Sequence, residues 1–78
     1  MISVCIATYN GARYIAEQLA SILNQLSAED EVVVSDDGST DGTIDIVRSF
    51  NDRRIRIVDG PRRHSPTLNF EWALRNAK

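Results

Sequence analysis

The side chains best suited to bind a ligand stand directly after two short β-branched stretches. Tyr9 follows the first stretch, and the carboxylates Asp36 and Asp37 follow the second. A tyrosine ring can stack on the flat face of a uracil or thymine base. A carboxylate only accepts hydrogen bonds, which suits the N3–H donor of the same bases. These residues therefore predict a pocket for a pyrimidine nucleotide, with Tyr9 on the ring face and Asp37 on the ring edge.

The elements that must position these residues alternate between strand and helix patterns. Short β-branched runs predict strands, and apolar residues at three- and four-residue spacing predict helices. Ser39 or Asp41 is expected to cap the second helix, and Pro66 suits the first turn of the third. The expected strands cover residues 2–8, 31–35 and 54–59, and the expected helices cover residues 12–26, the segment from this cap to residue 50, and residues 66–78.

This order, β-α-β-α-β-α, predicts an α/β fold with a three-stranded parallel sheet and right-handed crossovers, half of a Rossmann-like doubly wound fold. Ligands bind such sheets outside the carboxyl ends of the strands, where Tyr9 and Asp37 fall. The expected inner faces are Ile44, Val47 and Phe50 on the second helix, and Phe70, Ala73, Leu74 and Ala77 on the third.

Composition and missing motifs exclude several classes of protein. The chain has 78 residues and a net charge of −2, without the basic face of a nucleic-acid binder. It has neither a GxGxxG motif nor a GxxxxGK[ST] motif, which argues against a dinucleotide dehydrogenase and a P-loop NTPase. The single Cys5 and the lack of metal-ligand spacing point to a reducing compartment. A cytoplasmic location is therefore expected. A peripheral location of the full-length protein at the inner face of the membrane is a further option.

Two segments carry a resemblance to a known family. Residues 3–10 (Ser-Val-Cys-Ile-Ala-Thr-Tyr-Asn) and residues 33–43, with their Asp-Asp-Gly-Ser-Thr-Asp-Gly-Thr run, look like the opening of family 2 glycosyltransferases, which share the GT-A fold. Residues 65–74 resemble the rhamnosyltransferase-like branch, which builds bacterial surface polysaccharides. The resemblance implies an inverting transferase that moves a sugar from a UDP- or dTDP-sugar to a glycan or lipid-linked acceptor.

The same resemblance assigns roles to individual residues. It places Ala7 and Tyr9 in the lining of the base pocket, with the aromatic ring stacked on the base, and it makes Asp37 the acceptor of the N3–H. Thr8 and Asn69 complete the set of nucleotide-binding candidates. A strand-propensity role for Thr8 and a helix-surface role for Asn69 are their alternatives.

The family's catalytic residues are expected beyond Lys78. In the family, a later Asp-x-Asp-like motif holds Mg²⁺ or Mn²⁺ on the diphosphate, and a still later Asp or Glu deprotonates the acceptor. Residues 1–78 are therefore expected to be the N-terminal nucleotide-sugar-binding part, truncated at the C-terminal end, with no catalytic or metal residue and no activity alone. Without a fourth strand, one edge of the strand at residues 2–8 would lie open and could pair with a second copy of the chain.

Other interpretations stay open at this level. A signalling receiver domain of flavodoxin-like order needs a phosphoacceptor Asp after the third strand and an acidic pair after the first strand, where this chain has Thr8, Tyr9 and Asn10. A non-catalytic nucleotide-binding or interaction module of half-Rossmann type is the other alternative. Among single residues, turn and capping roles compete for Asp36 and Asp41, and a solvated loop is the expectation for Arg62, Arg63 and His64.

Overall fold

The computed structural model describes residues 1–62 and 65–77 and confirms the alternating order of strands and helices. Its elements are β1 (Ser3–Thr8), α1 (Ile15–Gln25), β2 (Glu31–Asp36), α2 (Thr43–Ser49), β3 (Ile55–Asp59) and α3 (Pro66–Asn76). None of these helices is long and apolar enough to cross a bilayer within the residues described.

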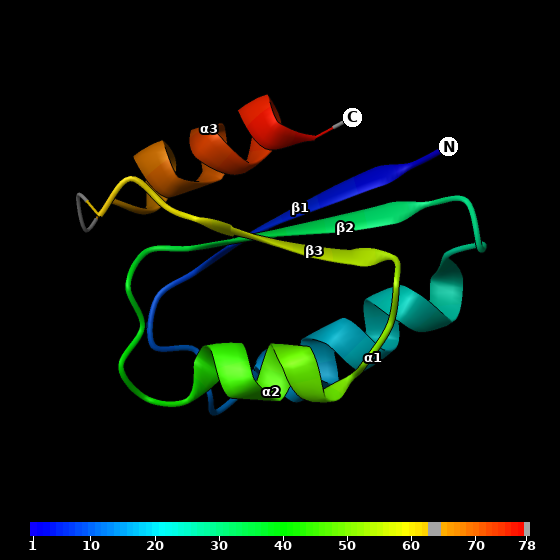
Figure 1. Ribbon diagram of the computed structural model, residues 1–78, viewed down its shortest axis with the longest axis horizontal. Coiled ribbons are helices and arrows are strands. Elements are labelled where there is room, and N and C mark those ends of the chain that lie inside the picture. The colour runs from blue at the N-terminus through cyan, green and yellow to red at the C-terminus, as the bar shows by residue number, and fades with distance from the viewer. Residues whose placement is uncertain (63–64, 78) are drawn as a thin grey trace.

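The three strands form one parallel sheet in the order β1-β2-β3. The register pairs Thr8 of β1 with Asp36 of β2, and Asp36 with Asp59 of β3. Central β2 is buried along its whole length because strands flank both its edges and helices cover both its faces (Figure 1). The carboxyl ends of all three strands therefore meet at one edge of the sheet, as expected.

Helices α1 and α2 lie on one face of the sheet, and α3 lies on the other (Figure 1). Alternate residues of a strand point to opposite faces, so one set of strand side chains meets α1 and α2. Complete burial of one such aliphatic side chain contributes about 1.5–3 kcal/mol to folding. The resulting core comprises Ile6, Ile15, Leu19, Val32, Val34 and Val47.

The buried side of α3 differs from the predicted one. Asn69 and Ala73 are buried, whereas Phe70 and Leu74 are 44% and 52% exposed. The prediction is therefore correct for Ala73 and wrong for Phe70 and Leu74, because the polar Asn69 fills the helix–sheet contact beside this small alanine. The helix also ends at Asn76, and Ala77 is already extended, so the described residues do not continue it as far as predicted.

The start and inner face of α2 also depart from the prediction. Gly42, with φ of 89°, is the N-cap residue, rather than Ser39 or Asp41. Val47 and Phe50 face the core as predicted, but Ile46 packs there in place of Ile44, which does not belong to that cluster. The left-handed backbone that only glycine adopts easily decides where the first turn begins.

Candidate functional site

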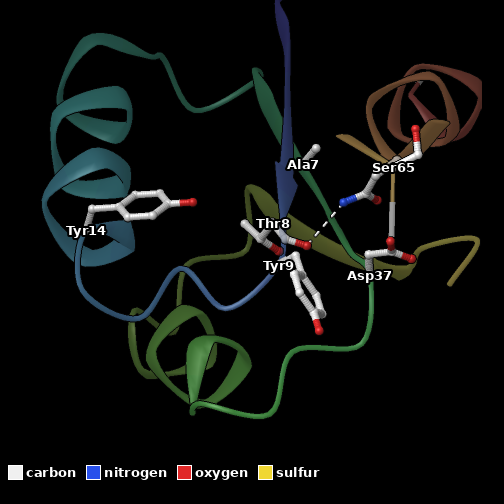
Figure 2. Close-up of a pocket in the computed structure, with 7 residues that line it drawn as sticks. Ala7, Thr8, Tyr9, Tyr14, Asp37 and Ser65 are labelled. Carbon is white, nitrogen blue, oxygen red and sulfur yellow. Dashed lines mark hydrogen bonds between the residues drawn. The ribbon is translucent and has the colours of Figure 1, made fainter. Parts of the chain in front are cut away.

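A cavity of about 270 Å³ opens at the carboxyl edge of the sheet (Figure 2). All five residues proposed from the sequence as nucleotide contacts line this cavity. Tyr14 and Ser65 line it as well, and the sequence interpretation did not include them. The full lining is Ala7, Thr8, Tyr9, Tyr14, Asp37, Ser65 and Asn69.

The two consecutive aspartates after β2 have different surroundings. The Asp36 carboxylate accepts hydrogen bonds from Thr8 Oγ1 at 2.7 Å and from Ser39 N at 2.9 Å. Asp36 thus closes its own loop and ties it to β1, which is the turn role considered from the sequence. The side chain of Asp37 is 1% exposed and lines the cavity. Its backbone N–H donates to Thr8 O at 2.9 Å, which fixes Asp37 beside the end of β1.

Asn69 braces the cavity from α3. Its Nδ2 donates to Thr8 O at 3.1 Å, and its Oδ1 accepts from Ser35 Oγ at 2.6 Å. The side chain is 3% exposed, so the helix-surface role considered for Asn69 is wrong. One amide therefore holds β1, β2 and α3 together behind the cavity. The Thr8 hydroxyl donates to Asp36, so Thr8 holds the end of β2 in addition to lining the cavity.

Gly60 lets the chain pass directly behind this brace. Its N–H donates to Asp36 O at 2.7 Å. A Cβ at this position would lie 2.7 Å from Asn69 Oδ1 and 3.0 Å from both Asp36 O and the Asp37 Cα. No larger residue fits here without moving the backbone that carries Asp37. The sequence showed this glycine only as the end of a strand.

The loops after β1 and β2 are joined by four hydrogen bonds, here called the loop staple. Asn10 N donates to Ser39 Oγ at 2.8 Å, and Asn10 Oδ1 accepts from Thr40 N at 2.8 Å. The other two bonds run from Gly11 N to Thr43 Oγ1 at 2.9 Å and from Ala12 N to Asp41 Oδ2 at 3.0 Å. The Ser-Thr-Asp-Gly-Thr part of the sequence motif thus holds the loop that follows Tyr9 in place.

Asp41 remains charged within this staple. Its hydrogen bonds, first from the Thr43 side chain and then from backbone amides, hold the pKa of the Asp41 carboxyl below its ordinary value. Because Asp41 also accepts from Thr43 N, it supports the first turn of α2 from just outside the N-cap.

The open side of the cavity carries the chain's two tyrosines and a helix cap. Tyr9 and Tyr14 are 48% and 50% exposed. Ser65 caps α3 by accepting from Leu68 N at 3.3 Å. The Ser-Pro pair at residues 65 and 66 is a readable helix-start signal, whereas nothing in the sequence marked Tyr14 as a neighbour of the cavity.

Neither a metal ligand set nor a basic cluster completes the site in the described part of the chain. No group of three or more His, Cys, Asp or Glu side chains there could hold a metal ion. Arg62 is exposed and its stem lies against Gly38, where a Cβ would come 3.1 Å from Arg62 Cδ. The other loop residues considered from the sequence, Arg63 and His64, lie outside the described residues.

A parallel α/β sheet with a pocket at its carboxyl edge defines the class of Rossmann-like nucleotide-binding proteins. Within that class, the chain belongs to glycosyl transferase family 2, whose sequence model matches residues 3–78. Two solved glycosyltransferase-family structures cover 99% of the chain. S. aureus TarS superimposes with a TM-score of 0.87 at 34% identity, and a mannosyltransferase from Pyrobaculum calidifontis, in complex with GDP-Man and Mn²⁺, superimposes with a TM-score of 0.84 at 35% identity.

Curated relatives agree with this assignment. A validoxylamine A glucosyltransferase from Streptomyces hygroscopicus subsp. jinggangensis is 54% identical over 61 residues, which are 74% of this chain. A chondroitin synthase from Pasteurella multocida is 38% identical over 63 residues, which are 78% of this chain. The chain spans 14% of the length of the first relative, 6% of the second, and 24% of each of the two solved structures.

Proposed function

We propose that this chain is the nucleotide-sugar-binding part of an inverting glycosyltransferase whose donor is a UDP- or dTDP-sugar. The observation that carries the proposal is that Tyr9 and the buried Asp37 line the same cavity. Family membership supports sugar transfer as the reaction of the whole protein.

In the proposed complex, the base stacks on Tyr9 while Asp37 accepts its N3–H. A charge-assisted hydrogen bond in a site shielded from water is stronger than one at the open surface. Asn69, Thr8 and Gly60 keep the Asp37 backbone in place, so the ligand meets an acceptor that needs no rearrangement. The pocket thereby selects a base with a ring N–H donor on the edge that faces Asp37.

The remaining parts of the reaction are assigned outside residues 1–78. The described residues do not fit a Mg²⁺ or Mn²⁺ ion, since they bring no suitable ligand group together. The proposed whole protein carries the metal ligands and the catalytic base in other segments, and this chain by itself transfers no sugar. The proposed acceptor is a glycan or lipid-linked molecule of bacterial surface polysaccharide synthesis, as in the rhamnosyltransferase-like branch. The proposed location of the whole protein is the cytoplasm, or the inner face of the membrane as a peripheral protein.

The experiment that tests the base pocket is a calorimetric titration of UDP, dTDP and GDP into the wild-type chain and the Asp37→Asn variant. Asparagine keeps the shape of the side chain but removes the charge. The amide oxygen can still accept the N3–H, so the variant exchanges a charge-assisted hydrogen bond for a neutral one and should weaken UDP binding by about 1 kcal/mol. Asp45→Asn is the matched control, because it makes the same change at an exposed position in the first turn of α2.

Each titration outcome has a definite meaning. Unchanged UDP affinity in Asp37→Asn would contradict the role of Asp37. Tighter binding of GDP than of UDP or dTDP would contradict the proposed donor, and this arm matters because the 35%-identical mannosyltransferase structure contains GDP-Man. Sugar transfer by the 78-residue chain alone would contradict the placement of the catalytic residues elsewhere.

A further inference from the structure

Tyr14 occupies a place that the proposed base contacts do not explain. It is the residue directly before α1, and it lines the same cavity as Tyr9 and Asp37. Figure 2 shows its ring extending from the start of α1, with the hydroxyl directed toward the end of β1. Tyr14 stands at the start of α1, which supplies none of the other lining residues, so only the tertiary fold brings it to the cavity.

The backbone around Tyr14 holds it firmly in this place. Gly11 O accepts hydrogen bonds from Tyr14 N at 3.1 Å and from Ile15 N at 3.0 Å. Gly11 N in turn donates to Thr43 Oγ1 at 2.9 Å, and Ile15 is completely buried in the core. Tyr14 therefore stands between a stapled turn and an anchored core residue.

The tyrosine ring itself lies over Gly11. A Cβ at residue 11 would come within 2.8 Å of both Cζ and Oη of Tyr14, so only glycine leaves the ring its present position. Yet the ring does not belong to the hydrophobic core or to the residues packed against it, and half of its surface is exposed. An aromatic side chain that is held in place but left half uncovered beside a cavity has apolar surface for a ligand to cover.

We infer that Tyr14 is a second aromatic wall of the pocket and contacts the nucleoside that Tyr9 and Asp37 hold. This inference rests on the proposed function and adds a contact to it. The ligand covers the ring face that solvent covers in the free chain, and the hydroxyl offers a donor or acceptor to the nucleoside. Tyr9 and Tyr14 then enclose the ligand from two segments, one directly after β1 and one directly before α1.

Two different substitutions remove this contact. Tyr14→Ala deletes the ring, whereas Gly11→Ala leaves the ring in the protein but pushes it from its place. Because the clash in Gly11→Ala involves the far end of a flexible side chain, the backbone need not move. Phe70→Ala is the matched control, since Phe70 has a similar exposure of 44% and does not line the cavity.

The test is a calorimetric titration of UDP into the wild-type chain and these variants, with circular dichroism to verify folding. Tyr14→Ala and Gly11→Ala should each weaken UDP binding roughly fivefold or more, the scale of one aromatic contact to a base. Phe70→Ala should bind like the wild type. In the wild-type complex, nuclear Overhauser effects between UDP protons and the Tyr14 ring should appear.

Wild-type affinity in both Tyr14→Ala and Gly11→Ala, or the absence of these Overhauser effects in a saturated complex, would overturn the inference. If Tyr14→Ala fails to fold, Gly11→Ala and the Overhauser effects still decide. Failure of the proposed function has a separate signature: the wild-type chain would not bind UDP, or Asp37→Asn would bind it unchanged. Loss of binding in Asp37→Asn but not in the Tyr14 and Gly11 variants would contradict only the role of Tyr14.

Discussion

At the end of β2, two neighbouring aspartates divide the work of the site between them. The Asp36 carboxylate accepts hydrogen bonds from Thr8 and Ser39, while Asp37 lines the cavity. Asp36 is the last residue of β2, whereas Asp37 is the first residue of the loop that follows it. Identical residue types therefore serve structure at one position and the proposed ligand contact at the next.

Gly60 should be the most sensitive single position of the site. In Gly60→Ala, the new methyl group would press on the backbone of Asp36 and Asp37 and on Asn69. Overpacking of this kind typically costs about 1–3 kcal/mol, and we expect a corresponding loss in the free energy of unfolding, measured in urea. Gly11→Ala is the control, since the three atoms nearest its methyl group all belong to the Tyr14 ring and hydroxyl, which can move, and it should cause no comparable loss. Equal free energies of unfolding for Gly60→Ala and the wild type would contradict this prediction and show that the backbone near Asp37 can shift to accommodate the methyl group.

At the scale of elements, the loop staple explains why so many polar residues follow β1 and β2. Each loop supplies donors that the other loop accepts, so neither is held by its own strand alone. The Asp41 carboxylate contributes as an anion, and its pKa is lowered in the folded state. Its contribution to stability is therefore present above the ordinary carboxyl pKa of about 4 and is lost as the pH falls through the lowered value.

Asn10 offers a direct test of the staple, because it joins the two loops with both its N–H and its side chain. Its φ of 52° lies in the left-handed region, which asparagine and glycine tolerate better than alanine. Asn10→Ala should lose about 1–2 kcal/mol of stability, and Asn10→Gly should lose less because glycine keeps the backbone angle. In both variants, hydrogen exchange at the Thr40 amide should accelerate, since its acceptor is gone.

The exposed Asn24 on α1 provides the comparison for these variants. Asn24→Ala should leave Thr40 exchange unchanged. If Asn10→Gly also left it unchanged, the Asn10–Thr40 bond would not hold the loops together in solution.

At the scale of the whole molecule, the sheet leaves the outer edge of β1 available. Among the described residues, β1 pairs with β2 alone. Ile2 O accepts from Glu31 N of β2, and Thr8 O accepts from Asp37 N directly after it. The alternate residues Cys5 and Ala7 therefore direct their backbone groups to the other side. A strand edge of this kind is a template for pairing with another chain.

We expect the chain to self-associate through this edge. Light scattering should show a mass above that of the monomer at high concentration, and the amides of Cys5 and Ala7 should become more protected from hydrogen exchange as the concentration rises. The Val4 and Ile6 amides, which face β2 by the same alternation, provide the internal control and should be protected at all concentrations. A monomer in which Cys5 and Ala7 are equally protected at every concentration would contradict this expectation.

The sequence by itself determined the order of the elements and five of the seven residues that line the cavity. Both depend on local signals: β-branched runs and helical spacing set the elements, and parallel strands with one chain direction bring their ends to one edge. The tertiary structure decided which residues of α3 are buried, because a helix that carries Asn69 and Ala73 to the sheet must turn Phe70 and Leu74 outward. It also decided the roles of Tyr14, Gly60 and Asn10, since each depends on a contact with a segment or backbone path that periodicity does not encode.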